Sequence, residues 1–304
     1  MTSPFDTVGD RYGIVVVNYN SSSLIAENLV RSGFAPNSAV IVVDNSDDAA
    51  EKARLIDLSS EHDWTVIDAG GNIGFGAGVN MGVARAVSME CDAVLLLNPD
   101  AMIDGEHFTR LAATQARFPR TMISPVIDRD DGTVWFSGAV IDASRGVASH
   151  RLDRFEDSDW LSGACLSVPL AVWRELGGMD SDYFLYWEDV DFTSRWRLRG
   201  NDLLVASDVR ATHSVGGTQA ASRGKSLIFI YYNCRNRLLF ASKNMPRKTT
   251  LLWGLTTPGY WLLMLRLARV RRSPEKFEII RAVVAGTASG LRASTRPFMS
   301  RKKR

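Results

Sequence analysis

Residues 13–20 read Gly13-Ile14-Val15-Val16-Val17-Asn18-Tyr19-Asn20, a short β-branched run that ends abruptly in polar residues. Two more short apolar runs follow at Val40–Val43 and Ala93–Leu97. Such runs are typical of buried parallel strands. Patterns with helical periodicity lie between them, at 23–31, 49–60 and 78–88, and a short extra strand is expected at 64–67. This alternation predicts an α/β fold with a Rossmann-like, mostly parallel sheet flanked by helices.

Each of the three main runs ends in a polar cluster, namely Asn18-Tyr19-Asn20, Asp44-Asn45-Ser46-Asp47 and Asn98-Pro99-Asp100. Ligands of open parallel sheets bind beyond the carboxyl ends of the strands, so the three clusters are expected to converge on one crevice. Asn, Asp, Ser and Pro are also ordinary turn formers, and for a single cluster that alternative is equally good. Three clusters in succession favour a binding site.

The composition of the 304-residue chain, with 45% apolar residues, excludes disordered and fibrous classes. Residues 243–304 carry fifteen Lys and Arg against two acids, a net charge of +13. Since the whole chain has a formal charge of +2, residues 1–242 carry −11. An acidic body joined to a basic tail indicates that the two parts meet different partners.

The three cysteines are far apart and form no C-x-x-C pair, which argues against a disulfide framework and for a reducing cytosol. No signal peptide is evident at the N-terminus. The longest apolar run of the tail, 251–265, is interrupted by Thr-Thr-Pro-Gly and falls short of the ~20 residues that a spanning helix needs. We therefore expect no transmembrane helix.

The glycine-rich stretch 70–78 precedes a helix and offers backbone N–H groups to an anion. It is not a Walker loop, because no Gly-Lys-Ser/Thr follows, and it lies too late in the chain for a dinucleotide fingerprint. Further on, the chain is irregular over 128–159, with short strands expected at 133–137 and 139–141. A strand over 161–168 and a helix over 170–176 follow.

The densest cluster of acidic and aromatic residues spans 180–191 and leads into a helix expected over 192–199. Glu188, Asp189 and Asp191 fall at the N-terminus of that helix, where its dipole favours negative charge. Helix capping explains one such carboxylate. It does not require three carboxylates flanked by four aromatic residues.

Seven segments in this order resemble the inverting glycosyltransferases of family 2, which have a GT-A fold, and within them the rhamnosyltransferase-like group. The matching segments are 16–20, 43–46, 72–76, 97–100, 162–164, 177–180 and 187–191. The resemblance spans roughly residues 12–242. It implies a catalytic domain over 1–242, with a nucleotide-sugar half at about 12–127 and a catalytic, acceptor-binding half at about 128–242. Residues 243–304 would form a basic amphipathic helical extension.

The resemblance implies a nucleotide-sugar donor and a divalent cation, Mg²⁺ or Mn²⁺, that neutralises the diphosphate leaving group. Asp100 occupies the position of the metal-binding carboxylate, and Asn98 replaces the first Asp of the family's D-x-D motif. Asn98 retains the ability to hydrogen-bond ribose or phosphate. His213 matches a histidine that completes the metal and diphosphate site in relatives, although a lone histidine is often structural.

Catalytic and binding roles follow from the same resemblance. The family's Glu-Asp signature places the general base on Asp189, with Glu188 as its rival. Acceptor contacts fall to Trp160, Trp187 and Asp191. Packing beneath the helix is an equally simple interpretation for the two tryptophans, and for Asp191 helix capping or support of its neighbours is favoured over a direct contact. The donor nucleotide would be bound by Asn18, Asp44, Asn45, Asn72, Gly74, Phe75, Asn80 and Asn98.

A helix is expected over 227–241, with a family-like Tyr-Tyr-Asn-x-Arg-Asn pattern. Its Asn233, Arg235, Asn236 and Arg237 could reach phosphate or acceptor, or form a solvated face. In the tail, Leu251, Leu252, Trp253, Tyr260, Trp261, Leu262, Leu263 and Leu265 precede Arg266, Arg269, Arg271 and Arg272. That order favours a helix lying in a membrane interface. The alternative is a helical hairpin packed on the catalytic domain or on a homodimer partner.

The resemblance thus implies an inverting transferase that moves a sugar, L-rhamnose from dTDP-rhamnose, onto a cell-envelope glycan or lipid-linked glycan. The protein is expected in the cytoplasm, peripheral on the inner face of the plasma membrane. Another donor such as UDP-galactofuranose is the alternative. A nucleotidyltransferase is disfavoured because no basic loop follows the first strand. A nucleic-acid-binding protein using the tail is disfavoured by the acidic body, so no nucleic-acid partner is expected.

Overall fold

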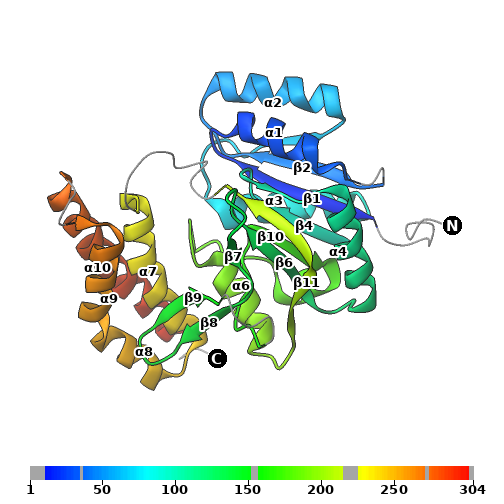
Figure 1. Cartoon of the computed structure of the whole chain (residues 1–304). Helices are drawn as coiled ribbons and strands as arrows, with labels where there is room; N and C mark the ends of the chain where they lie inside the picture. Colours follow the sequence, from blue (N-terminus) through cyan, green and yellow to red (C-terminus); the bar gives the residue numbers. More distant parts are fainter. Residues whose placement is uncertain (1–10, 35–36, 152–156, 215–224, 271–273, 301–304) are drawn as a thin grey trace.

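A computed structural model describes residues 11–34, 37–151, 157–214, 225–270 and 274–300 (Figure 1). Its core is a nine-stranded sheet in the order β3-β2-β1-β4-β10-β6-β11-β5, with β7 paired to β6. A separate hairpin is formed by β8 and β9. The strands are β1 (Tyr12–Asn18), β2 (Ala39–Asp44), β3 (Thr65–Asp68), β4 (Ala93–Leu97), β5 (Ala101–Met102), β6 (Met122–Asp128), β7 (Val134–Phe136), β8 (Ala139–Asp142), β9 (Val147–His150), β10 (Cys165–Pro169) and β11 (Leu203–His213).

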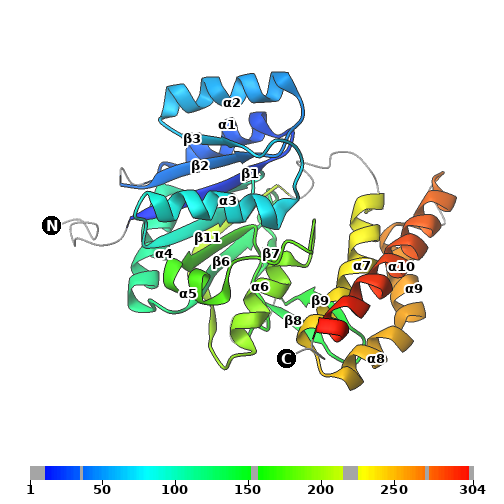
Figure 2. The same ribbon diagram turned by 180° about the vertical axis from the view of Figure 1, so that it is seen from behind.

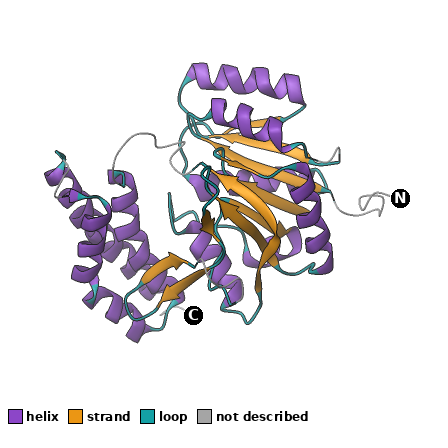
Figure 3. Cartoon of the chain, viewed as in Figure 1, coloured by secondary structure: helices purple, strands orange, loops and turns teal. Residues whose placement is uncertain are grey.

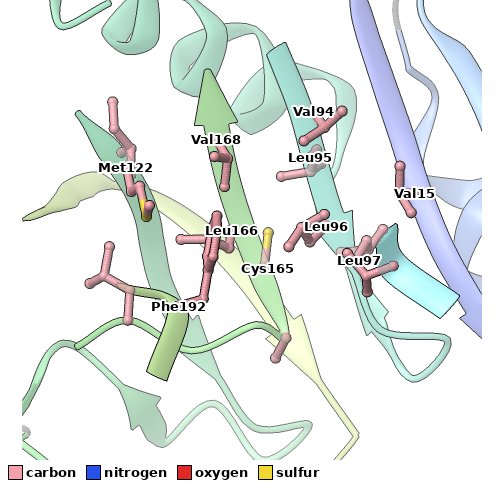
Figure 4. Close-up of a cluster of buried hydrophobic side chains, with 14 of the residues drawn as sticks. Val15, Val94, Leu95, Leu96, Leu97, Met122, Cys165, Leu166, Val168 and Phe192 are labelled. Atoms are coloured by element: carbon pink, nitrogen blue, oxygen red, sulfur yellow. The ribbon is translucent and has the colours of Figure 1, made fainter. Parts of the chain in front are cut away.

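The predicted α/β class with a mostly parallel sheet is confirmed. Strands β1 to β4 pair in parallel, as the β-branched runs predict. β10 is antiparallel to β4 and β6, and β11 then runs parallel to β6. Figure 4 shows how the apolar side chains of β4 and β10 fill the centre of the sheet. Leu95, Leu96, Cys165 and Leu166 are completely buried there.

Helices cover both faces of this sheet (Figures 2 and 3). The helices of the sheet domain are α1 (Ser22–Ser32), α2 (Ala49–His62), α3 (Phe75–Ser88), α4 (Gly105–Arg117), α5 (Leu170–Leu176) and α6 (Glu188–Arg197). On one face, Gly78 and Gly82 let α3 approach the side chains of Val17 and Val15. On the other face, Phe108 of α4 packs edge-on against Tyr12 of β1.

Three of the boundaries that differ from the sequence-based expectation lie beside the polar strand ends. Helix α3 begins at Phe75, so the second half of the glycine-rich stretch is helical. Helix α6 begins at Glu188, which puts all three carboxylates inside its first turn. Strand β10 begins only at Cys165, because residues 161–164 form a loop whose backbone bonds to other parts of the molecule.

The C-terminal helices form a group beside the sheet domain, packed with the β8–β9 hairpin (Figure 1). They are α7 (Leu227–Asn244), α8 (Arg247–Leu255), α9 (Thr257–Leu267) and α10 (Lys276–Ser300). Residue 242, the predicted domain boundary, lies within α7. Helix α10 approaches α7 closely at Gly286 and Gly290, where added side chains would collide with the α7 backbone.

The rings of Trp253, Tyr260 and Trp261 pack inside this group, which differs from their predicted insertion into a membrane interface. Trp253 is completely buried and donates from Nε1 to the carbonyl oxygen of Ala143, 2.8 Å away. Tyr260 is only 6% exposed, and Trp261 donates to Thr287 of α10. Several leucines, including Leu251 and Leu262, remain exposed, while Arg271 and Arg272 lie outside the described residues.

None of the described helices combines the length and apolar character required to cross a bilayer.

Candidate active site

The ends of β1 and β2 are tied together by a buried polar network. Asn18 donates from Nδ2 to Oδ1 of Asp44 and to Oγ of Ser46, at 2.9 and 3.1 Å. Its Oδ1 accepts the Ser21 N–H. Asn18 is completely buried and Asp44 is 1% exposed. Both residues were predicted to bind the nucleotide, and their hydrogen bonds also hold the ends of β1 and β2 together.

Asn45 connects this network to the glycine-rich loop. Its Nδ2 donates to the Gly74 carbonyl at 3.0 Å, while its buried Oδ1 has no partner among the described residues. Gly74 has φ of 90°, and a Cβ there would lie 2.5 Å from the carbonyl oxygen of Phe184. Asn72 is exposed and accepts the Gly74 N–H. Only glycine therefore fits where the loop meets residue 184.

Asn80 lies one turn into α3 and holds the chain that leads to the acidic cluster. Its amide donates to the carbonyl of Met179 at 2.8 Å and accepts the Met179 N–H at 2.9 Å. Both polar atoms of its side chain are thus bonded to one residue. This arrangement gives Asn80 a bracing role in place of a free surface for nucleotide.

Asp100 and His213 meet although they are 113 positions apart, because the end of β11 pairs with β5. His213 Nε2 lies 3.0 Å from Asp100 Oδ1, and both residues are buried. The Trp135 ring packs 4.5 Å from the His213 ring, and His150 contacts Trp135 in turn. Sequence patterns gave no signal for Trp135 or His150, since β7 and β9 reach the histidine only through tertiary packing.

The Asp100–His213 pair suits a divalent cation. It combines a hard carboxylate oxygen with an imidazole nitrogen, and Mg²⁺ in nucleotide enzymes commonly takes only one or two protein carboxylates plus phosphate oxygens. His213 Nδ1 is buried without a partner in the described chain. Within the described ranges no group of three or more His, Cys, Asp or Glu residues is assembled, so a cation at this pair would need further ligands from a bound molecule or water.

Glu188 and Asp189 lie side by side in the first turn of α6 but in different surroundings. Glu188 is 6% exposed, lies against Gly76, and has no partner for its buried Oε2. Burial raises its pKa well above the usual range, and the neighbouring charge of Asp189 raises it further. Asp189 is half-buried and accepts N–H groups from Gly163 and Val190, at 3.0 and 2.8 Å.

Burial raises the pKa of Asp189 as well, but the two N–H groups stabilise its charged form and oppose this shift. The two environments therefore give the two carboxyl groups different pKa values. Asp189 is the first to ionise, and Glu188 holds its proton to higher pH. An ionised carboxylate with a raised pKa is suited to accept a proton from a hydroxyl group.

Gly163 links the carboxylates to the end of β4. A Cβ on Gly163 would lie 3.3 Å from Cβ of Asp189 and 3.7 Å from Cε1 of Phe75. The next residue, Ala164, accepts the Asn98 N–H at 3.0 Å. The structure thus brings Asp189, Phe75 and the Asn98–Asp100 turn to one edge of the sheet. Residues 162–164 stood out in the sequence, but the backbone contact of Gly163 could not be inferred from it.

Two residues predicted to contact an acceptor are enclosed by protein. Asp191 is 1% exposed and bonds to Tyr183, Asn244 and Arg195. Trp187 is 4% exposed and packs against the α7 and α8 side chains Phe240 and Trp253. The structure therefore gives both residues a packing role, because neither presents a free surface to a sugar.

Trp160 is also buried, at 5% exposure, but its indole N–H has no partner in the described chain.

Helix α7 holds the segment that precedes the carboxylates. Asn233 accepts the indole N–H of Trp187, Arg235 donates to the Asp182 carbonyl, and Asn236 donates to the carbonyls of Leu185 and Tyr186. Arg237 is 1% exposed and points to the tail instead. These polar residues are therefore not a solvated face.

Known proteins of related sequence are named as glycosyltransferases. The chain is 28% identical over 306 residues to a low-salt glycan biosynthesis hexosyltransferase, Agl10, of Haloferax volcanii, covering 95% of this chain and 94% of that protein. It is 27% identical to an N-acetylglucosaminyl-diphospho-decaprenol L-rhamnosyltransferase of Mycobacterium tuberculosis, covering 60% and 69%. It is 22% identical to the dTDP-rhamnosyl transferase RfbF of Shigella flexneri, covering 92% and 95%.

Solved structures show the same fold at low sequence identity. A mannosyltransferase of Pyrobaculum calidifontis, in complex with GDP-Man and Mn²⁺, superposes with a TM-score of 0.59 at 15% identity, covering 94% of this chain and 88% of that one. TarS residues 1–349 of S. aureus superpose with a TM-score of 0.55 at 15% identity, covering 96% and 91%. The model of glycosyltransferase-like family 2 matches residues 10–240, which are most of the chain and include Asp100, Asp189 and His213. We conclude that this protein is a glycosyltransferase and belongs to family 2.

Proposed function

We propose that the enzyme transfers L-rhamnose from dTDP-rhamnose, with inversion at the anomeric carbon, to a cell-envelope glycan or a lipid-linked glycan. The donor is supported by the names of two relatives, a dTDP-rhamnosyl transferase and an L-rhamnosyltransferase. The observation that carries the mechanism is the Asp189 carboxylate, held by the Gly163 N–H beside the end of β4.

In this proposal Asp189 is the general base. It takes the proton of the acceptor hydroxyl while that oxygen attacks the anomeric carbon from the face opposite the diphosphate. Two backbone N–H groups orient the carboxylate before the acceptor arrives. Glu188 stays protonated and keeps a second negative charge away from the base.

Asp100 and His213 would hold Mg²⁺ or Mn²⁺, which when bound offsets the charge that develops on the leaving diphosphate. Support comes from the 3.0 Å contact between the two side chains and from the Mn²⁺ in the P. calidifontis mannosyltransferase complex. Asn45, Asn72, Gly74, Phe75 and Asn98 would contact the nucleotide. Asn18, Asp44 and Asn80 would hold that pocket in shape, and the unpartnered N–H of Trp160 would face the acceptor side.

The donor is tested with a panel of nucleotide sugars, each with Mg²⁺ or Mn²⁺, by measuring release of nucleoside diphosphate. We expect turnover of dTDP-rhamnose and little of the UDP- and GDP-sugars. Activity with UDP-galactofuranose but not with dTDP-rhamnose would overturn the donor assignment and leave the family and fold unaffected. Product analysis by NMR would then report whether the anomeric configuration is inverted.

We also propose that the tail holds the enzyme on the inner face of the plasma membrane, where a lipid-linked acceptor would be reached. Helix α10 supports this proposal, because Phe277, Ile280, Val284 and Leu291 recur with helical spacing and are between 47% and 84% exposed. Their spacing places them on one side of the helix. Lys276, Arg281 and Arg292 are exposed on the same helix. Basic residues beside an exposed apolar stripe favour binding to membranes that contain anionic lipid. Packing of this face on a second copy of the chain is the alternative.

A further inference from the structure

The segment just before the two carboxylates has an unusual backbone. Tyr186 and Trp187 both have positive φ, 64° and 73°, although neither is glycine. Large side chains are disfavoured in this left-handed region because Cβ crowds the backbone, and two such residues in succession persist only where their surroundings hold them. The pair ends at Glu188, where α6 begins.

The group that holds this backbone is the side-chain amide of Asn236. Its Nδ2 donates to the carbonyls of Leu185 and Tyr186, at 2.9 and 2.7 Å, so one amide fixes two successive peptide groups. Its Oδ1 accepts from the guanidinium of Arg235, and the residue is completely buried. Every polar atom of the Asn236 side chain is therefore used.

We propose that Asn236 is a positioning residue for the transfer reaction, because it fixes the left-handed turn that directs Glu188 toward Gly76 and Asp189 toward Gly163. This inference rests on the proposed catalytic role of the carboxylates. Alanine would remove the amide donor from both carbonyls, and aspartate would present oxygen atoms to them.

The first test compares Asn236→Ala with Cys234→Ala. Cys234 is buried on the opposite side of α7 and bonds to Thr287, so it serves as a control for general damage to the helix. Nucleoside diphosphate release is measured with the donor that the unaltered enzyme turns over. For Asn236→Ala we expect kcat to fall up to about 100-fold, since displacement of a catalytic group by about 1 Å has that effect, with the KM for donor little changed. Equal losses of kcat in the two variants would overturn the proposal.

A second measurement does not depend on activity. Backbone amide exchange in peptides covering residues 182–191 should be faster in Asn236→Ala than in the unaltered protein, and unchanged in Cys234→Ala. Unchanged exchange in Asn236→Ala would contradict a role in holding the turn. If Asp189→Asn remained active, the assignment of the base would fail, whereas the exchange data would still report whether Asn236 fixes the turn.

The third test removes the backbone strain itself. Glycine adopts positive φ without steric cost, so Tyr186→Gly in the Asn236→Ala background should recover part of the lost kcat. The same change in the unaltered protein should lower kcat modestly, because the contact of the Tyr186 ring with Phe229 is lost. If Tyr186→Gly instead deepens the defect of Asn236→Ala, relief of strain is not the relation between the residues and the proposal is withdrawn.

Discussion

At the scale of single residues, the neighbouring carboxyl groups of Asp189 and Glu188 lead to different predictions. Asp189→Asn keeps the shape of the side chain but cannot accept a proton. We expect transfer to fall by roughly 10²- to 10⁴-fold, with donor affinity near that of the unaltered enzyme. Steady-state kinetics with calorimetric titration of the donor would measure both. Retained turnover in this variant, together with its loss in Glu188→Gln, would move the base to Glu188.

The raised pKa of Glu188 also leads to a prediction of how the stability of the protein varies with pH. Burial raises its pKa in the folded protein above that of the unfolded chain, so folding favours the protonated form. This contribution is fully present below the unfolded pKa and is lost as pH rises toward the folded pKa. Glu188→Gln does not titrate, so its Tm relative to the unaltered protein should increase as pH rises above the ordinary glutamate pKa. A difference in Tm that does not change with pH would show that Glu188 is not held protonated.

A third prediction at this scale concerns metal binding by Asp100. If Asp100 binds the cation, Asp100→Ala should weaken donor binding and remove the dependence of turnover on Mg²⁺ or Mn²⁺. Rates measured across a metal titration would show this effect. Asp104, an exposed carboxylate four residues further along the chain, is a matched control, since it caps α4. A normal metal titration in Asp100→Ala would exclude it as a ligand.

At the scale of elements, α7 joins the catalytic segment to the tail. Its asparagines bind residues 185–187, while Arg237 donates to the carbonyls of Arg145 and Gly146 and to the hydroxyls of Thr256 and Thr257. The same guanidinium stacks on the rings of Trp253 and Tyr260. Burial lowers its pKa to about 10. One buried cation thus fixes the β8–β9 turn and the α8–α9 junction to α7.

Replacing Arg237 with methionine would leave those four acceptors without a donor. We expect the free energy of unfolding to fall by about 2–4 kcal/mol, because burying polar groups that have lost a charged hydrogen-bond partner costs free energy. Denaturant titration would measure the loss. Arg281→Met on the exposed side of α10 should change stability by less than about 0.5 kcal/mol. Equal stabilities of the two variants would mean that Arg237 does not hold the tail.

At the scale of the whole molecule, an acidic catalytic body carries a basic helical group with an apolar stripe. We expect the full chain to float with anionic liposomes at low salt and to be released partly at high salt. Serine in place of Phe277, Val284 and Leu291 should abolish flotation. Serine at Val30 and Ile56, which are exposed on α1 and α2, is the control and should have no effect.

Two results would count against the membrane proposal. If the unaltered chain fails to float with any anionic vesicle, the tail does not bind lipid. If the serine variant instead changes the oligomeric state in sedimentation experiments, the α10 stripe is an interface between copies of the chain.

The sequence by itself determined the parallel strands β1 to β4, several helices and the family, whereas it did not predict β6, β11 or α4. Strand 93–97 and helix 170–176 have the predicted bounds, because their hydrophobic periodicity is local and matches one type of element. The polar residues after each strand were also readable, since parallel strands place their carboxyl ends at one edge. Motif order then indicated family 2 without any knowledge of contacts.

Tertiary structure alone decided which of the polar residues are free to react. Asp100 meets His213 only because β5 pairs with β11, and Asp191 is enclosed only because α7 supplies Asn244. The start of α6 at Glu188 depends on a left-handed turn held by Asn236, which lies about fifty positions further along the chain. Local sequence preference opposes that turn. Contacts of this kind depend on the folded chain as a whole, and no pattern of neighbouring residues encodes them.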